Sequence, residues 1–541
     1  MPEFDALKYA YPSHRNVVYA RRAMACTSVP LGAQIGLDVM KAGGNAMDAA
    51  VAMAAAMPLL EPTGNGLGSD CFALIWVEKE KKLYGLNASG VAPKALSADS
   101  LKEKGLREMP KAGWLPTMVP GAPAGWAAVN ERFGAKPLDE LFAPAIAYAR
   151  EGCPVPVNVD KQWAVDSRRI AAAMAKDPAP HAYWWKSFMK EDGTPYRAGD
   201  LFRWEEYAQT LEELAATHCE SYYRGPLMEK IVAFSKETGG YFCEEDFKHY
   251  HPDWVEPITA DYKGYTVCEI PPNGHGISTL MALNILKELD LGPVDSFRST
   301  HLQLEAMKLA FADARRYVAD PDYMTVPVER LLSDEYAAQR RACIGDRARL
   351  PEPGDPIRGG TVYMCAADGE GNMISYIQSN YMGFGSGVVV PGTGIAMQNR
   401  GNNFSMDPAS DNCVAPGKRP YHTIIPGFLC KDGKPIGPFG VMGGFMQPQG
   451  HLQVVLNTVE YGMNPQAALD HPRWQWVGGN TIEVEQSFPN DLAQALQRAG
   501  HDIVVKADPI GFGRGEIIWR NDEGVLCGAS EPRSDGQVAV W

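Results

Sequence analysis

The spacing of apolar and polar residues changes along this chain, and the change falls near residue 361. Between about 125 and 350 the pattern is mostly helical, as in the long mixed stretches 201–237 and 300–319. After residue 361, short runs of β-branched and apolar residues predominate, which is typical of strands. Helix patterns interrupt those strands near 447–461, 464–469 and 490–499. The chain therefore predicts a mixed α and β fold.

Two elements are predicted near the start of the chain. Residues 46–59 are rich in alanine and methionine and follow Asn45, a favourable N-cap, so we expect a buried helix there. Residues 72–77 and 82–86 are strand-like and flank a charged turn, which predicts a β-hairpin. A chain of 541 residues exceeds the usual size of one core, so it predicts two modules or one large composite domain.

Composition narrows the range of partners. The residues are 45% hydrophobic and 21% charged, as in an ordinary globular protein. The net charge of −14 argues against nucleic acid or an anionic membrane as a partner, although one local arginine can still bind an anionic substrate. No run of about 20 apolar residues predicts a membrane span, and the first residues lack the pattern of a signal peptide. We therefore expect a cytoplasmic protein.

The number and spacing of the cysteines agree with the reducing conditions of the cytoplasm. The 11 cysteines are an odd number and include no Cys-x-x-Cys pair, so we expect free thiols rather than a disulfide framework or a zinc site. His249 and His251 have no third ligand nearby in the sequence, and His275 lies in a Pro/Gly loop as a structural or pocket-rim residue. We predict no metal and no cofactor.

Thr361 is the strongest chemical candidate. It opens a strand-like run, 361–367, directly after Gly359 and Gly360, and a turn at 368–372 leads into a second strand. If the Gly360–Thr361 bond is cut, Thr361 gains an α-amine with a pKa of about 7.7, which can accept the proton of its own hydroxyl. A Gly-Thr dipeptide alone more often only begins a strand. The preceding segment 346–360 is rich in Arg, Pro, Gly and Asp, as a cleavage loop should be.

Further motifs, weak singly but specific in this order and spacing, run through most of the chain. They are residues 43–50, 63–70, 119–125, 271–276, 361–380, 383–387, 393–395, 399–405, 416–420, 443–444 and 528–533. In this arrangement the chain resembles the gamma-glutamyltranspeptidase family of N-terminal-nucleophile hydrolases. The resemblance implies a four-layer αββα sandwich, with self-cleavage between Gly360 and Thr361. A large subunit, 1–360, and a small subunit, 361–541, would result.

The resemblance also implies roles for particular residues. Thr361 corresponds to the nucleophile, first in self-cleavage and then in attack on a substrate amide. Ser379 falls where the family has a second hydroxyl, usually threonine, that hydrogen-bonds the nucleophile. Gly443 and Gly444 match the glycines whose N–H groups form the oxyanion hole, where one well-aimed donor contributes roughly 3–4 kcal/mol.

The predicted substrate pocket departs from the family pattern. The arginine that holds a glutamyl α-carboxylate is Ser89 here, and the carboxylate that holds the α-ammonium is Asn403. A family glutamine is replaced by Arg400, whose guanidinium can bind a carboxylate in bidentate geometry. Three further positions also differ: Tyr381, His422 and Thr423. We therefore expect an acyl group that bears a carboxylate and lacks an α-amine, although Arg400 could instead be an ion-pair partner of a nearby acid.

Three functional hypotheses follow. The first is an autoprocessed amidohydrolase that cleaves an oxamate-type or glutaryl-type amide through an acyl-enzyme. The second is a true gamma-glutamyltransferase or glutathione hydrolase that recognises the amino acid with different residues. The third is an unprocessed, non-catalytic homologue, against which the joint presence of Thr361, Ser379, Gly443 and Gly444 argues. The expected partners are a small-molecule amide and the two fragments of the chain, with a homo-oligomer left open.

Overall fold

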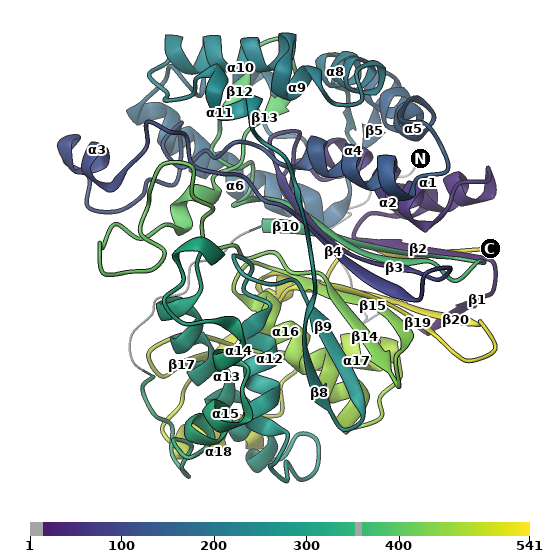
Figure 1. Cartoon of the computed structure of the whole chain (residues 1–541), viewed down its shortest axis with the longest axis vertical. Coiled ribbons are helices and arrows are strands. Elements are labelled where there is room, and N and C mark those ends of the chain that lie inside the picture. The colour runs from purple at the N-terminus through teal and green to yellow at the C-terminus, as the bar shows by residue number, and fades with distance from the viewer. Residues whose placement is uncertain (1–14, 352–359) are drawn as a thin grey trace.

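Two seven-stranded sheets lie face to face between two layers of helices (Figure 1). The computed structural model describes residues 15–351 and 360–541. The first sheet has, in spatial order, β21 (Gln537–Val540), β2 (Ala23–Thr27), β10 (Gly360–Asp368), β11 (Met373–Tyr381), β3 (Asp70–Val77), β4 (Lys82–Ala88) and β7 (Asp253–Val255). The second has β1 (Val18–Ala20), β20 (Leu526–Ser530), β19 (Arg514–Arg520), β15 (Lys434–Met442), β14 (Gly427–Lys431), β9 (Tyr265–Glu269) and β8 (Ile258–Tyr262).

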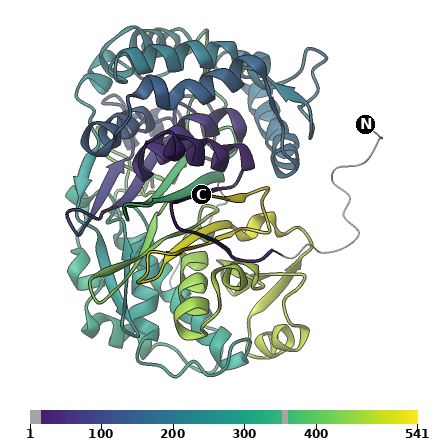
Figure 2. The same cartoon turned by 90° about the vertical axis from the view of Figure 1, so that its right-hand side faces the viewer.

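The outer helices fall into two groups on either side of the sheets, as the view turned by 90° also shows (Figure 2). The group beside the first sheet comprises α1 (Pro30–Lys41), α2 (Ala46–Leu60), α3 (Ala98–Glu103), α4 (Ala122–Phe133), α5 (Leu138–Glu151), α6 (Val157–Lys176), α7 (Ala182–Phe188), α8 (Glu205–Ala216), α9 (Ser221–Arg224), α10 (Pro226–Glu237) and α11 (Glu244–Lys248). The group beside the second sheet comprises α12 (Ile277–Leu286), α13 (Phe297–Tyr317), α14 (Val328–Leu331), α15 (Asp334–Arg341), α16 (Met446–Val455), α17 (Pro465–Asp470) and α18 (Asn490–Arg498).

Smaller strand pairs complete the fold: β5 (Cys153–Pro154) with β6 (Leu201–Phe202), β12 (Val389–Val390) with β13 (Ile395–Ala396), and the three-stranded sheet β16 (Trp474–Gly478), β17 (Thr481–Glu485) and β18 (Asp502–Lys506). The four-layer αββα fold and the mixed α and β content predicted from the sequence are confirmed. The helix patterns near 447–461, 464–469 and 490–499 correspond to α16 with its π-helical extension Leu456–Glu460, to α17 and to α18.

The core between the sheets explains why several strands read as almost continuous apolar runs. All eight residues of β3 are buried, because the sheet is covered by α-helices on one face and by the second sheet on the other. Helix α2 begins where predicted, since the Asn45 side chain accepts the N–H groups of Met47 and Asp48. Its fully buried alanines allow it to pack closely on β10 and β11. The predicted β3–β4 hairpin also forms.

The predicted cleavage point does not separate two domains. In the first sheet four strands precede residue 360 and three follow it, and in the second three precede it and four follow. Both fragments of a chain cut before Thr361 would share both sheets, so the cut would leave one jointly built fold. Residues 352–359 of the predicted cleavage loop lie outside the described residues.

Candidate active site

Thr361 lies at an irregularity in the first sheet. Strand β10 pairs with β11 through Gly360 and Tyr381, then through Val362 and Gln378, so the register shifts by one residue at Thr361. Bulges of this kind re-aim a side chain and are frequent next to active sites. The opposite strand ends at Tyr381, which is buried and has a positive φ of 77°, a strained conformation for a bulky residue.

Ser379 is the immediate partner of Thr361. Their hydroxyl oxygens are 3.1 Å apart, and both residues are buried. The Ser379 oxygen also accepts the backbone N–H of Tyr381 at 2.8 Å and a guanidinium N–H of Arg400 at 3.1 Å. Because two donors occupy its lone pairs, the Ser379 hydroxyl is arranged to donate its own proton. Thr361 Oγ1 is an acceptor within reach, so Ser379 can stabilise negative charge that develops there.

The N-terminus of α16 reaches the same hydroxyl. Gln447 Nε2 lies 3.4 Å from Thr361 Oγ1, while its Oε1 accepts the N–H of Ile425 at 3.0 Å. Gly443 and Gly444 precede this helix with φ values of 137° and 61°, a region that favours glycine. Within the described residues, neither of their N–H groups donates a backbone hydrogen bond. The hydrogen bond between this segment and Thr361 is made by Gln447, three residues after Gly444, so the oxyanion role of the two glycines stays a prediction.

Arg400 lies fully buried on the other side of Ser379. Its Nη2 contacts Ser379, and its Nη1 donates to Thr423 Oγ1 at 2.5 Å. The Tyr381 ring packs against the guanidinium at 4.5 Å from its centroid. In the described part of the chain, Arg400 Nε is buried without a hydrogen-bond partner, and no carboxylate lies within 4.0 Å of the guanidinium. The edge formed by Nε and Nη2 can therefore accept a carboxylate in bidentate geometry.

The nearest compensating charge is Asp70, which sequence reasoning missed. Asp70 pairs in register with Ser379, from the adjacent strand β3. Burial raises the pKa of Asp70 to about 7, although the charge of Arg400 opposes that rise. Burial lowers the pKa of Arg400 to about 10, and Asp70 counteracts this, so Arg400 stays charged at neutral pH. The two groups influence each other without forming a contact ion pair.

The His422 side chain forms its hydrogen bond with Asp70, not with Arg400. Its Nδ1 faces the backbone N–H of Ile424 at 3.4 Å, so the proton is on Nε2, which donates to Asp70 Oδ2 at 2.9 Å. Burial, with Arg400 nearby, holds the pKa of His422 well below its usual range, so the ring is neutral. Gly90 N–H and Gln398 Nε2 also approach the Asp70 carboxylate, at 2.9 and 3.4 Å.

The two remaining positions of the predicted substrate pocket are Asn403 and Ser89. Asn403 ends the short 3-10 helix that begins at Arg400, and its Nδ2 is buried without a partner among the described residues. Ser89 is buried and donates to Asn87 Oδ1 at 2.7 Å. The side chain of Arg419 donates to Ser89 and to Asp253. Ser89 therefore serves the packing of this loop and offers no charge to a substrate.

His275 was expected to be either structural or at a pocket rim, and it is fully buried. Its Nε2 donates to the Thr423 carbonyl at 2.8 Å, which places it directly behind the residue that holds Arg400. Ser386, in the motif 383–387, is buried and donates to the backbone carbonyl of Met397. His249 and His251 are exposed and lie beside single acidic residues.

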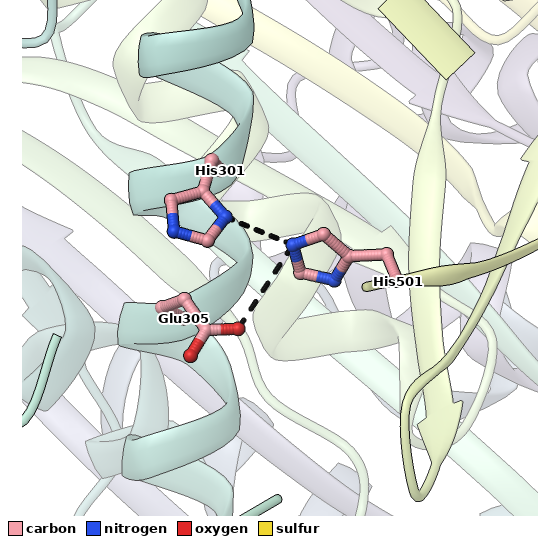
Figure 3. Close-up of side chains that lie close together, drawn as sticks. All are labelled: His301, Glu305 and His501. Atoms are coloured by element: carbon pink, nitrogen blue, oxygen red, sulfur yellow. Dashed lines mark hydrogen bonds and ion pairs between the residues drawn. The ribbon is translucent and has the colours of Figure 1, made fainter. Parts of the chain in front are cut away.

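A second polar cluster lies away from Thr361 (Figure 3). His301 and Glu305, one turn apart on α13, meet His501 from the loop before β18, with ligand atoms within 4.8 Å of one another. Sequence reasoning missed this set because His501 is 200 positions from His301. His301 Nε2 donates to the Gly345 carbonyl at 2.8 Å, so its Nδ1 accepts His501 Nε2–H at 2.9 Å.

The cluster already contains a cation. Lys308 Nζ donates to Glu305 Oε1 at 2.7 Å and lies 3.5 Å from His501 Nδ1, the nitrogen that the tautomer leaves as an acceptor. Burial lowers the pKa of His501 to about 3, so the ring is neutral. Glu305 Oε2 also accepts the Arg349 N–H at 3.2 Å. With every ligand atom hydrogen-bonded, the geometry favours a clamp on residues 345–349 over a metal centre.

Comparisons with known proteins agree with this fold. Residues 32–541 match the family model described as gamma-glutamyltranspeptidase. A solved structure described as cephalosporin acylase from Bacillus halodurans is 55% identical, with a TM-score of 0.96 over 100% of this chain and 99% of its own. The glutathione hydrolase-like YwrD proenzyme of Bacillus subtilis is 34% identical, covering 96% of this chain and 98% of its own length. The oxamate amidohydrolase proenzyme of Klebsiella pneumoniae subsp. pneumoniae is 32% identical over the same shares.

Two further observations concern membrane spans and thiols. None of their helices combines the length and the apolarity needed to cross a membrane. The 11 cysteines are all free in the structure.

Proposed function

The chain belongs to the gamma-glutamyltranspeptidase family, and we propose that Thr361 is its nucleophile and that its acyl pocket takes a small carboxylate-bearing acid. The family and its relatives make the chain an amidohydrolase of the self-processing, N-terminal-nucleophile type. The substrate follows from the pocket. The observation that carries the proposal is Arg400, buried, with an unpartnered Nε among the described residues, and separated from Thr361 only by the Ser379 hydroxyl.

In self-cleavage, Thr361 Oγ1 attacks the carbonyl carbon of Gly360. The C–N bond breaks, the acyl group moves to oxygen as an ester, and the α-amine of Thr361 is released. Water then hydrolyses the ester, giving a carboxylate on Gly360 and restoring the Thr361 hydroxyl. The register shift at Thr361 supports this step. A bulge takes the backbone of Thr361 out of the regular ladder and re-aims its side chain.

In turnover, the free α-amine takes the hydroxyl proton while Oγ1 attacks the substrate amide. The oxyanion forms beside the N–H groups of Gly443 and Gly444, and Ser379 donates to Oγ1. Collapse of the intermediate transfers the proton to the leaving amine and leaves an acyl ester on Thr361. Water attacks that ester, which releases the acid and regenerates the hydroxyl.

The charges around the acyl group set its chemistry. An α-ammonium would meet the buried cation of Arg400, and Asn403 supplies no counter-charge. A carboxylate would instead fill the open Nε and Nη2 edge of Arg400 and provide the hydrogen bond that Nε lacks within the described residues. These features support an oxamate-type or glutaryl-type acyl group over gamma-glutamyl.

A glutathione hydrolase is the second candidate, favoured by the name of the Bacillus subtilis relative. The test compares oxalyl- and glutaryl-4-nitroanilide with gamma-glutamyl-4-nitroanilide on the purified, processed enzyme. We expect kcat/KM on at least one desamino substrate to exceed that on the gamma-glutamyl substrate. A clear preference for the gamma-glutamyl compound would overturn the proposed acyl specificity and favour the second candidate.

A further inference from the structure

A buried ion pair lies against the backbone of Thr361. Arg514 Nη2 donates to the Thr361 carbonyl oxygen at 3.4 Å, and Arg514 Nη1 donates to Glu61 Oε1 at 2.8 Å. Glu61 is fully buried, and Arg514 is 5% exposed. The second Glu61 oxygen, Oε2, accepts the Ser28 hydroxyl at 2.5 Å. Breaking a buried pair leaves an uncompensated charge, so the geometry of this one is well fixed.

The two members of the pair come from different sheets and from different predicted fragments. Glu61 follows helix α2, which packs on the first sheet, and belongs to the large fragment. Arg514 begins strand β19 of the second sheet and belongs to the small fragment. It pairs in register with Met442, the residue before Gly443, and Gly513 packs against Gly443. The pair therefore connects the large fragment with Thr361 and with the predicted oxyanion segment.

Gly64 allows the chain after Glu61 to lie directly against Thr361. A Cβ atom on Gly64 would come within 2.9 Å of the Val362 side chain, 3.3 Å of Glu61 Oε1 and 3.4 Å of the Thr361 carbonyl oxygen. The Gly64 carbonyl also accepts the N–H of Asn380 at 3.0 Å. Close approach of this loop therefore helps to bring the Glu61 carboxylate beside the Thr361 carbonyl.

Self-cleavage would remove one constraint on Thr361. In the precursor the peptide bond to Gly360 fixes its nitrogen, whereas after cleavage Thr361 is a chain terminus, and termini lose order unless they are tied down. We propose that Arg514 and Glu61 are a positioning pair that holds Thr361 by its carbonyl, so that its hydroxyl and α-amine keep the geometry of turnover. The inference rests on the proposed self-cleavage before Thr361. A misplaced nucleophile loses rate rather than affinity, so the pair should act on kcat rather than on KM.

The charges of the pair give a signature that packing alone does not. A nearby cation disfavours protonation of the Thr361 α-amine, and a nearby anion favours it. Removing only the Arg514 charge should therefore raise the pKa of the amine, whereas removing only the Glu61 charge should lower it. A pair that served packing alone would not move this pKa in opposite directions.

Three other charged groups face the same region. Arg400 and Asp70 lie on the far side of Ser379 from Thr361. Asp535 is the third, and burial raises its pKa, with the charge of Glu61 adding to the rise and that of Arg514 opposing it. Arg400 and Asp70 stay unchanged in the variants below. Asp535→Asn, added to each variant, excludes Asp535 as the titrating group.

The test uses Arg514→Met, Glu61→Gln and the double variant on an amide that the parent hydrolyses. Methionine is similarly long and has no N–H donor. Arg520→Met is the matched control, because Arg520 ends the same strand and faces Glu78 of the large fragment at 3.7 Å. If an unpaired Glu61 prevents Arg514→Met from folding, comparing the double variant with Glu61→Gln tests the same donor.

We expect Arg514→Met to complete self-cleavage and to lower kcat about 10-fold, with KM changed less than twofold. The ascending limb of the pH profile of kcat/KM reports the free α-amine. It should move up by about one pH unit in Arg514→Met and down in Glu61→Gln. The double variant should return the limb to the parent's position and keep the low kcat. Arg520→Met should match the parent in both.

A parent-like kcat in Arg514→Met, or a limb that moves in the same direction in both single variants, would overturn the proposal. Labelling of the Thr361 α-amine with acetic anhydride across pH, read by mass spectrometry, needs no amide turnover. If the processed parent hydrolyses no acidic amide but the labelling pKa still moves in opposite directions, the acyl specificity fails and the positioning pair stands. Labelling unchanged in both variants would overturn the pair, and a parent that stays one chain would refute the self-cleavage on which it rests.

Discussion

The two sides of Ser379 differ in what they share with the family. On one side lie Thr361, Gly443 and Gly444, which match the family pattern by resemblance and surround the reacting carbonyl in our proposal. On the other side lies Arg400, where the family has a glutamine, with Tyr381 packed against it. One hydroxyl contacts both sides, since Ser379 lies 3.1 Å from Thr361 Oγ1 and 3.1 Å from Arg400 Nη2. If the proposed roles hold, the comparison teaches that substrate recognition can change at residues in direct contact with an unchanged reaction centre.

The contact between the two sides has a physical cost. Placing a guanidinium in a site with no exposure requires compensating hydrogen-bond acceptors and negative charge. Thr423 and Ser379 accept its N–H groups, and Asp70 supplies a negative charge nearby without a direct contact. The strained backbone of Tyr381 completes the arrangement, because it brings the ring over Arg400 and its N–H onto Ser379.

Replacing Thr361, the proposed nucleophile, should abolish both self-cleavage and amide hydrolysis. We expect Thr361→Ala to remain a single chain, and the parent to give fragments of about 39 and 20 kDa at ~0.11 kDa per residue. Amide hydrolysis should fall by at least about 10³-fold, since the adjacent Ser379 hydroxyl has no free α-amine of its own to take its proton. A denaturing gel and an amidase assay measure both effects. If the alanine variant still processes or still turns over amides, Thr361 is not the nucleophile.

Replacing Arg400 should weaken recognition of the acyl carboxylate and leave self-cleavage intact. We expect Arg400→Gln to lower kcat/KM on the preferred acidic amide by about 10- to 150-fold, because a charged hydrogen bond contributes roughly 1.5–3 kcal/mol. Glutamine keeps an N–H donor for Ser379, so self-cleavage should continue. Unchanged kinetics on acidic amides would place Arg400 in a purely structural role.

The double variant Arg400→Gln with Asn403→Asp sharpens the same test. It restores the family's charges at both positions, so activity should move toward gamma-glutamyl amides relative to either single variant. Recovery should be partial, because Ser89 supplies no cation for the α-carboxylate. A double variant with no gain on gamma-glutamyl-4-nitroanilide would show that the two charges do not set the preference.

The titration of Asp70 should make both protein stability and binding of an acidic amide near Arg400 depend on pH. Its folded pKa of about 7 lies above the ordinary value of 3.8, so the folded protein holds this proton more tightly than the unfolded chain. The resulting contribution to stability is fully present below about pH 4 and is lost as pH rises through about 7. Ionised Asp70 also offsets the charge of Arg400, so KM for an acidic amide should rise about three- to tenfold over the same range.

The control for this effect is Asp70→Asn. It should flatten both the pH dependence of KM for the acidic amide and the pH dependence of the melting temperature between pH 5 and 8. A neutral amide, which does not need Arg400, should show little of the KM change in the parent enzyme. An Asp70→Asn enzyme with the parent's pH profile would exclude Asp70 as the titrating group.

The fold followed from the sequence more fully than the site did. The capped helix α2 and the β3–β4 hairpin follow from local spacing, and the αββα layers from the family resemblance. Asp70 is the last residue of the motif 63–70, yet nothing local showed that strand pairing would place it opposite Ser379. His301 and His501 were likewise invisible, because only the packing of α13 against a loop 200 residues later joins them. Sequence spacing reports neighbours on one element, whereas charge compensation in the core depends on contacts between elements.

The cluster of His301, Glu305 and His501 lies outside the proposed active site. Changes there should therefore have the smallest effect on activity. With Lys308 already paired to Glu305, a divalent ion would have to displace an ammonium from a buried carboxylate. We expect EDTA or added Zn²⁺ to change kcat/KM less than twofold. His501→Gln should lower the melting temperature by a few degrees through the lost hydrogen bond to His301, with unchanged substrate preference. Loss of activity on chelation, restored by Zn²⁺, would instead make the cluster a metal centre and require Lys308 to move away from it.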